Sequence, residues 1–117
     1  MGLLLGQAAA VATVVLGLMG LVFPARAAAF TGLSAQSRTG FGEFRATYGG
    51  LFVALGLAPL VLGQPVVFGV VSVTWLGTAV GRLVSLVVDD GLREPRGFGA
   101  LALEAGLGLA MVPAAGW

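Results

Sequence analysis

Four long and almost uncharged apolar runs are the feature that most constrains this chain. They cover approximately residues 3–23, 42–62, 65–88 and 98–116. A helix of about 20 apolar residues crosses a hydrocarbon core of ~30 Å. The chain is 58% hydrophobic and 9% charged, with a mean hydropathy of +1.04, so a soluble fold would lack the polar residues needed to cover these runs. We therefore predict an all-α, integral membrane four-helix bundle, with residues 1–117 as a single domain.

The breaks between the runs predict where the helices end. The first run ends at Pro24 and lacks a charged n-region and a cleavage site in the expected place, which favours a retained helix over a cleaved signal peptide. Residues 24–41 are predicted to form a long loop, with a short interfacial helical turn at 25–30. Pro65 suits the first position of the third helix. Residues 89–97 are predicted to be a charged loop that joins the third helix to the fourth.

The charges fall on one side of the predicted bundle. All six Arg and five acids lie at or near the ends of the spans that share this side, and the opposite side carries the two termini and the turn at 63–65. The positive-inside rule places the charged side in the cytoplasm and both termini outside, with Trp117 as an interfacial anchor. The composition, rich in Ala, Gly, Val and Leu and with Arg in place of Lys, is typical of a GC-rich bacterial genome. We expect a multi-pass protein of the bacterial inner membrane.

The missing residue types exclude several functions. The chain has no Cys and no His, which argues against disulfides, thiol nucleophiles, imidazole bases and the usual zinc or haem ligands. It has no Lys and a formal net charge of only +1, so it lacks a polybasic tract that would bind nucleic acid. We predict no cofactor, no metal and no nucleic-acid partner.

The stretch GEFRATYGG, residues 42–50, places an acid, a base and a phenol at the start of the second run. Glu43 and Arg45 are two residues apart, about 200° around a helix, so they cannot face each other. Tyr48 lies one turn further along and can donate its hydroxyl to a carboxylate. Partners for Glu43 and Arg45 are therefore expected on other helices.

The third run carries a polar stripe that supplies such partners. Thr78, Arg82, Ser85 and Asp89 recur at helical spacing, with Arg82 roughly 10 Å from Asp89 along the axis. Glu104 lies roughly 9 Å inside the fourth run. An ionisable residue at the centre of a membrane helix costs about 2.5–3.5 kcal/mol, which pairing offsets.

We expect these charges to pair across helices. Arg82 would pair with Glu43 or Glu104, and Arg45 with Glu104 or Asp89. Three interpretations stay open: a structural clasp, a polar pocket that opens to the cytoplasm and binds a small or amphiphilic ligand, or arginines that extend to the headgroups. The candidate cluster consists of Glu43, Arg45, Tyr48, Arg82, Ser85, Asp89 and Glu104.

Small residues at helical spacing predict close helix packing. Gly2 and Gly6 form one G-x-x-x-G pair, and Gly77 and Gly81 form another that Ser85 continues. We expect these glycines to serve packing within the chain, in preference to a homodimer face.

Several motifs resemble a known family. They are E-x-R-A-x-Y-G-G at Glu43–Gly50, G-R-x-x-S at Gly81–Ser85, an Asp-Gly turn and the pair Leu103-Glu104. Together they resemble the small bacterial four-helix membrane proteins described as domain of unknown function 4345. The resemblance implies a membrane bundle with a polar cluster at one end, and no established reaction. Two aspartates, Asp89 and Asp90, precede the turn glycine, which leaves open which of them faces the cluster.

The function that these patterns favour is binding and not catalysis. We expect a membrane protein that binds a lipid-like ligand or another membrane protein subunit, with membrane lipids as its surroundings. One alternative is a small transporter or proton-coupled carrier in which Glu43 or Glu104 changes protonation. Another is a membrane enzyme that acts on a lipid through Glu43, Tyr48, Glu104 and Arg82, although no nucleophile or metal site supports it.

Overall fold

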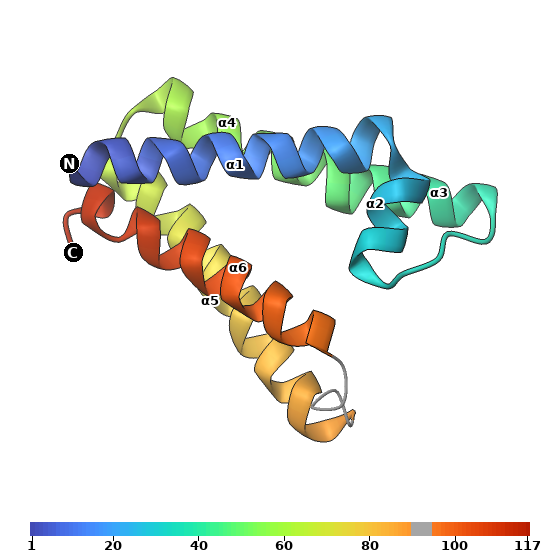
Figure 1. Cartoon of the computed structure of the whole chain (residues 1–117). Helices are drawn as coiled ribbons and strands as arrows, with labels where there is room; N and C mark the ends of the chain where they lie inside the picture. Colours follow the sequence, from blue (N-terminus) through green and yellow to red (C-terminus); the bar gives the residue numbers. More distant parts are fainter. Residues whose placement is uncertain (90–94) are drawn as a thin grey trace. The chain divides into compact units, whose positions relative to one another are not determined.

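The computed structural model describes residues 1–89 and 95–117, and within these ranges the chain is helical and has no strand. The elements are α1 (Gly2–Val22), α2 (Pro24–Thr31), α3 (Arg38–Phe44), the π-helix η1 (Arg45–Leu51), α4 (Phe52–Leu62), α5 (Pro65–Val88), α6 (Pro95–Met111) and the 3₁₀ turn η3 (Pro113–Ala115) (Figure 1). Because α3, η1 and α4 follow one another without a break, they form one long helix. Four stretches are long and apolar enough to cross a membrane: residues 2–22, 38–62, 65–88 and 95–115. The predicted all-α membrane class is confirmed.

Two of the predicted spans begin earlier than expected because of their capping residues. The second span begins at Arg38, since the Ser37 hydroxyl accepts a hydrogen bond from the Gly40 N–H at 2.9 Å. The fourth begins at Pro95, a residue whose fixed φ suits a first helical position. Pro95 and Arg96 were expected in the charged loop, and that assignment was wrong. The rest of that predicted loop beyond Asp89, residues 90–94, lies outside the described residues.

The long loop predicted between the first two spans is partly helical, so that prediction was wrong in part. The eight-residue helix α2 starts at Pro24 and ends at Gly32, whose φ of +82° is easily adopted by glycine. Its Ala27 and Ala28 are buried together with Phe44 of α3. This contact explains why a sequence that reads as a loop forms a helix longer than the turn expected at 25–30.

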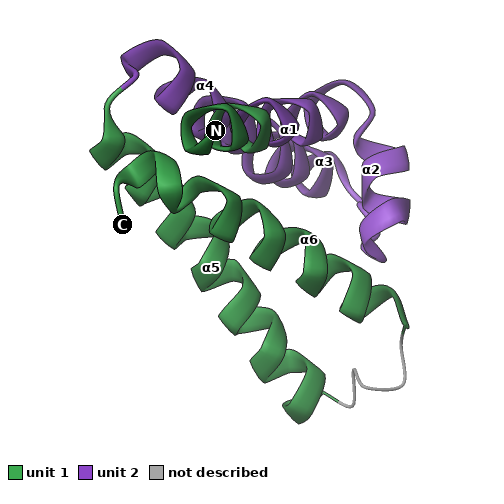
Figure 2. Cartoon of the chain, turned by 60° about the vertical axis from the view of Figure 1, so that its left-hand side comes forward, with its two compact units in different colours: residues 1–9, 64–117 green, residues 10–63 purple. Residues whose placement is uncertain are grey.

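The chain divides into two compact units (Figure 2). Unit 1 contains residues 1–9 and 64–117, and unit 2 contains residues 10–63. In unit 1, α5 and α6 lie side by side (Figure 1). The buried hydroxyl of Ser72 donates to the carbonyl of Gly108 at 2.7 Å, and a Cβ at Gly108 would come within 2.7 Å of Leu76. Small residues thus let these two helices approach closely.

In unit 2, α1 packs against the helix of residues 38–62 at glycine positions. A Cβ at Gly20 would collide with the carbonyl of Tyr48, and one at Gly49 would lie 2.8 Å from the Leu21 nitrogen. Further along, a Cβ at Gly56 would lie 2.6 Å from the Ala10 oxygen. The two backbones are therefore in contact along their length, as in other closely packed membrane helices.

The expected role of the G-x-x-x-G pairs is confirmed for one pair. In unit 1, a Cβ at Gly2 would lie 2.8 Å from Pro113, and one at Gly6 would lie 2.5 Å from Ala114. A Cβ at Gly77 or Gly81 would meet nothing within 4 Å among the described residues, so the expectation is wrong for this pair. The reason is that both glycines lie on an exposed face of α5, whereas α6 packs near its buried residues.

We predict that Gly20→Ala destabilises the protein by about 1–3 kcal/mol, because the new methyl group meets backbone that cannot move without separating the helices. The matched control is Gly77→Ala, which has open space and should be neutral or stabilising by up to ~1 kcal/mol through helix propensity. Thermal unfolding in detergent measures both. Equal effects of the two substitutions would contradict the close contact.

Candidate functional site

The residues of the predicted cluster fall into two groups, one in each unit, and each group is described within its own unit. The predicted pairing of Arg45 with Glu104 or Asp89 would join the two groups, and it stays a prediction. Unit 2 contains Glu43, Arg45 and Tyr48, and unit 1 contains Arg82, Ser85, Asp89 and Glu104.

Arg82 of α5 and Glu104 of α6 form an ion pair. The Arg82 Nε donates to both carboxylate oxygens of Glu104, at 3.0 and 2.9 Å, and Nη2 donates to Oε1 at 2.7 Å. Glu104 is buried, with 7% of its side chain exposed, whereas Arg82 is 37% exposed. Of the two acids expected for Arg82, the structure shows Glu104. A planar guanidinium that grips a carboxylate through several N–H groups compensates a buried charge well.

The other polar groups of the α5 stripe bond within their own helix. The Thr78 hydroxyl donates to the Thr74 carbonyl at 3.0 Å, and the Ser85 hydroxyl donates to Asp89 Oδ2 at 2.8 Å. Arg82 is thus the member of the stripe that links α5 to α6. Asp90 lies outside the described residues, so which aspartate faces the cluster stays open.

In unit 2, the stretch GEFRATYGG lies where the second span changes from α-helix to π-helix. The π-helix η1 covers Arg45–Leu51 and includes Tyr48, Gly49 and Gly50. A π segment widens the helix locally and is often found at functional sites. The sequence did not predict this change, and its only local sign is the Gly-Gly pair, where a Cβ at Gly49 would lie 2.8 Å from the Leu21 nitrogen of α1.

Arg45 has a partner that sequence reasoning missed. Its Nη1 donates to the carbonyl oxygen of Leu21, in the last turn of α1. The last four carbonyls of a helix have no partner within the helix, and a cation near them is favourable. Arg45 therefore caps α1. A second arginine of this unit, Arg26, lies over the Phe23 ring, with 5.7 Å between its Cζ and the ring centroid.

Glu43 lines an open pocket of about 370 Å³, which we name the loop pocket. Glu43 is the only charged residue among those that line it. Phe44 and Tyr48 form its aromatic wall, with stacked rings whose centroids are 4.5 Å apart. Sequence reasoning did not include residues 33–35 in the candidate site. The serines at positions 34 and 37 are the only local sign of a polar surface there. The loop pocket is lined by Leu33, Ser34, Ala35, Gly40, Glu43, Phe44, Thr47 and Tyr48.

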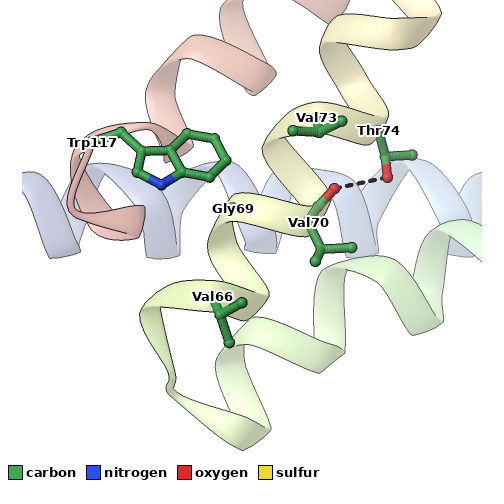
Figure 3. Close-up of a pocket in the computed structure, with 6 residues that line it drawn as sticks. All are labelled: Val66, Gly69, Val70, Val73, Thr74 and Trp117. Atoms are coloured by element: carbon green, nitrogen blue, oxygen red, sulfur yellow. Dashed lines mark hydrogen bonds between the residues drawn. The ribbon is translucent and has the colours of Figure 1, made fainter.

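A second pocket, of about 290 Å³, lies in unit 1 and is apolar (Figure 3). The Trp117 ring covers Gly69, where a Cβ would lie 2.8 Å from the ring carbon Cζ2. The Thr74 hydroxyl in this pocket donates to the Val70 carbonyl at 2.9 Å, so the lining presents mainly apolar surface. Such a surface suits contact with lipid chains. The lining consists of Val66, Gly69, Val70, Val73, Thr74 and Trp117.

Within residues 1–89 and 95–117, no group of three or more acidic, His or Cys side chains could hold a metal ion.

Four apolar helices of membrane-spanning length, with an Arg–Glu pair between two of them, define a helical membrane protein. The family described as "Domain of unknown function (DUF4345)" matches residues 3–115, so the chain belongs to this family and the resemblance seen in its motifs is confirmed. Comparison with curated proteins and with solved structures gives no match.

We predict that Arg82→Leu lowers the free energy of unfolding by on the order of 3 kcal/mol, because it leaves the buried Glu104 carboxylate uncompensated. The double variant Arg82→Leu with Glu104→Leu should recover much of that loss, since it removes both charges. Thermal stability of the single and double variants in detergent measures this coupling. Additive losses would show that the two charges do not stabilise each other.

Proposed function

We propose that this protein is a non-enzymatic integral membrane protein that binds a lipid-like amphiphile in the loop pocket. The observation that carries the proposal is the composition of this pocket, in which apolar and aromatic side chains lie beside a carboxylate and hydroxyl groups. An amphiphile needs both kinds of surface, one for its chain and one for its headgroup.

The position of the loop pocket in the chain supports the same proposal. Its lining comes from the connection after α2 and from the first turns of the span that starts at Arg38. Arg26 and Arg38 occur in the same part of the sequence, and arginines at the ends of membrane spans favour the headgroup level. A ligand in the loop pocket would therefore lie at the depth of lipid headgroups.

The Arg82–Glu104 pair fits a structural clasp better than a transport or catalytic site. Both oxygens of the Glu104 carboxylate accept hydrogen bonds from Arg82. A carrier cycle that protonated Glu104 would remove the counter-charge of Arg82, which is costly at membrane depth. The pair therefore supports the packing of α5 on α6, and the carrier and enzyme alternatives gain no support from it.

Another membrane protein subunit is the second candidate partner. The observation in its favour is the exposed face of α5, where Gly77, Gly81 and Ser85 follow one another at four-residue spacing. Faces of this kind let a second helix approach closely.

We predict that Ala35→Trp, which fills the loop pocket without changing its charge, greatly reduces the lipid that stays bound during purification. Native mass spectrometry of the protein released from detergent measures the bound lipid. The matched control is Ala46→Trp, an exposed position of the same unit that does not line the pocket. Equal lipid retention by both variants and the unaltered protein would contradict binding in the loop pocket.

We also propose that the protein lies in a bacterial inner membrane with both termini outside, and the arginine distribution supports this topology. Reporter fusions after Trp117 should show an external location, and fusions inserted at residues 34–39 should show a cytoplasmic one. The inverse pattern would contradict the topology.

A further inference from the structure

We infer that the loop pocket selects an amphiphile whose headgroup carries a primary ammonium group. This inference rests on the proposed function and adds the chemical class of the ligand. Its basis is the charge of the lining: Glu43 is the one charged side chain among the eight residues that form the pocket. A carboxylate disfavours an anionic headgroup and attracts a cationic one.

The arginines that could neutralise Glu43 within unit 2 lie elsewhere. Arg45 follows Glu43 by two residues, yet it donates to the Leu21 carbonyl and does not line the pocket. Arg26 lies over the Phe23 ring, and Arg38 is not part of the lining either. Within the described residues no ion pair involves Glu43. Within unit 2, the pocket therefore presents a carboxylate that no lining arginine neutralises and that can pair with the cation of a ligand.

The uncharged residues of the lining also suit an ammonium group. Ser34, Thr47 and Tyr48 supply hydroxyl oxygens, and an ammonium group has three N–H donors that require acceptors of this kind. The ring of Tyr48, which is partly exposed in the lining, adds an aromatic surface that a cation can contact. A neutral polyol could use the hydroxyl groups but would gain little from the carboxylate.

The ligand chemistry has two possible sources, a membrane lipid and a small soluble amine. The apolar part of the lining, which includes Leu33, Ala35 and Phe44, favours the lipid, because these side chains can contact an acyl chain but offer nothing to a small amine. A phospholipid with an ethanolamine headgroup has the required ammonium group and chains.

The test compares lipids with different headgroups on the same phosphate, of which only one carries an ammonium group. The purified protein is incubated with phosphatidylethanolamine, its N-acetyl derivative and phosphatidylglycerol of identical chains, and bound lipid is measured by native mass spectrometry. We expect phosphatidylethanolamine to be retained about tenfold better than the other two, the factor that corresponds to about 1.4 kcal/mol. Ethanolamine alone, tested by its effect on thermal stability, identifies the soluble source: stabilisation by ethanolamine as strong as that by the lipid would overturn the choice of a lipid.

Variants at Glu43 test the role of the carboxylate. Glu43→Gln should remove the preference for the ammonium lipid, and Glu43→Lys should shift the preference to phosphatidylglycerol. Ala46→Glu is the matched control, because it adds a carboxylate at an exposed position of the same unit that does not line the pocket, and it should leave the preference unchanged. A preference that survives in Glu43→Gln would overturn the inference.

Two outcomes distinguish a failure of this inference from a failure of the proposed function. If Ala35→Trp abolishes lipid retention but the unaltered protein binds all three lipids equally, the pocket binds lipid and the ammonium inference is wrong. If the unaltered protein retains none of the three lipids, both the inference and the proposed function are wrong.

Discussion

The contact between α1 and the π segment of the second span is the constraint on which the polar part of unit 2 depends. Because Gly20 has no side chain, the backbone of α1 can lie against the carbonyl of Tyr48. Gly49 makes the reciprocal approach to Leu21. This proximity brings the last carbonyls of α1 within reach of Arg45. A bulkier residue at either glycine would separate the helices and remove that hydrogen bond, so the packing determines where the Arg45 side chain is held.

The two polar groups differ in whether their charged side chains are paired. Arg82 and Glu104 neutralise each other through several hydrogen bonds, which leaves a closed pair that stabilises the packing of α5 on α6. Glu43 is exposed, lines an open pocket and forms no ion pair within the described residues. A closed pair is typical of a structural element, and an accessible charge beside hydroxyl and aromatic groups is typical of a binding site. This difference supports the proposal that the loop pocket binds a ligand and that the Arg82–Glu104 pair has a structural role.

Hydropathy predicted the spans well, and it failed where capping residues or a contact between separate elements determine the limits of a helix. The span 65–88 has the predicted limits because Pro65 starts it and Asp89 follows its end. The helix α2 was largely missed, since its stability depends on burying Ala27 and Ala28 against Phe44, a contact that no local pattern reveals. The sequence predicted Glu43 or Glu104 as the partner of Arg82, and the structure shows Glu104. The partner of Arg45 could not be foreseen, because every residue has a backbone carbonyl and none is marked in the sequence.

The contacts of Arg45 and Glu43 give a physical reason for their two-residue spacing in the E-x-R motif. The last carbonyls of a helix have no partner within the helix, so a donor from another segment stabilises the helix end. Arg45 supplies that donor to α1, and because its neighbour two residues back lies on a different side of the helix, the same guanidinium cannot also pair with Glu43. The arrangement separates a cation with a structural role from an acid that stays accessible. Within unit 2, therefore, no arginine that lines the loop pocket compensates Glu43, and the proposed selectivity for an ammonium headgroup rests on this observation.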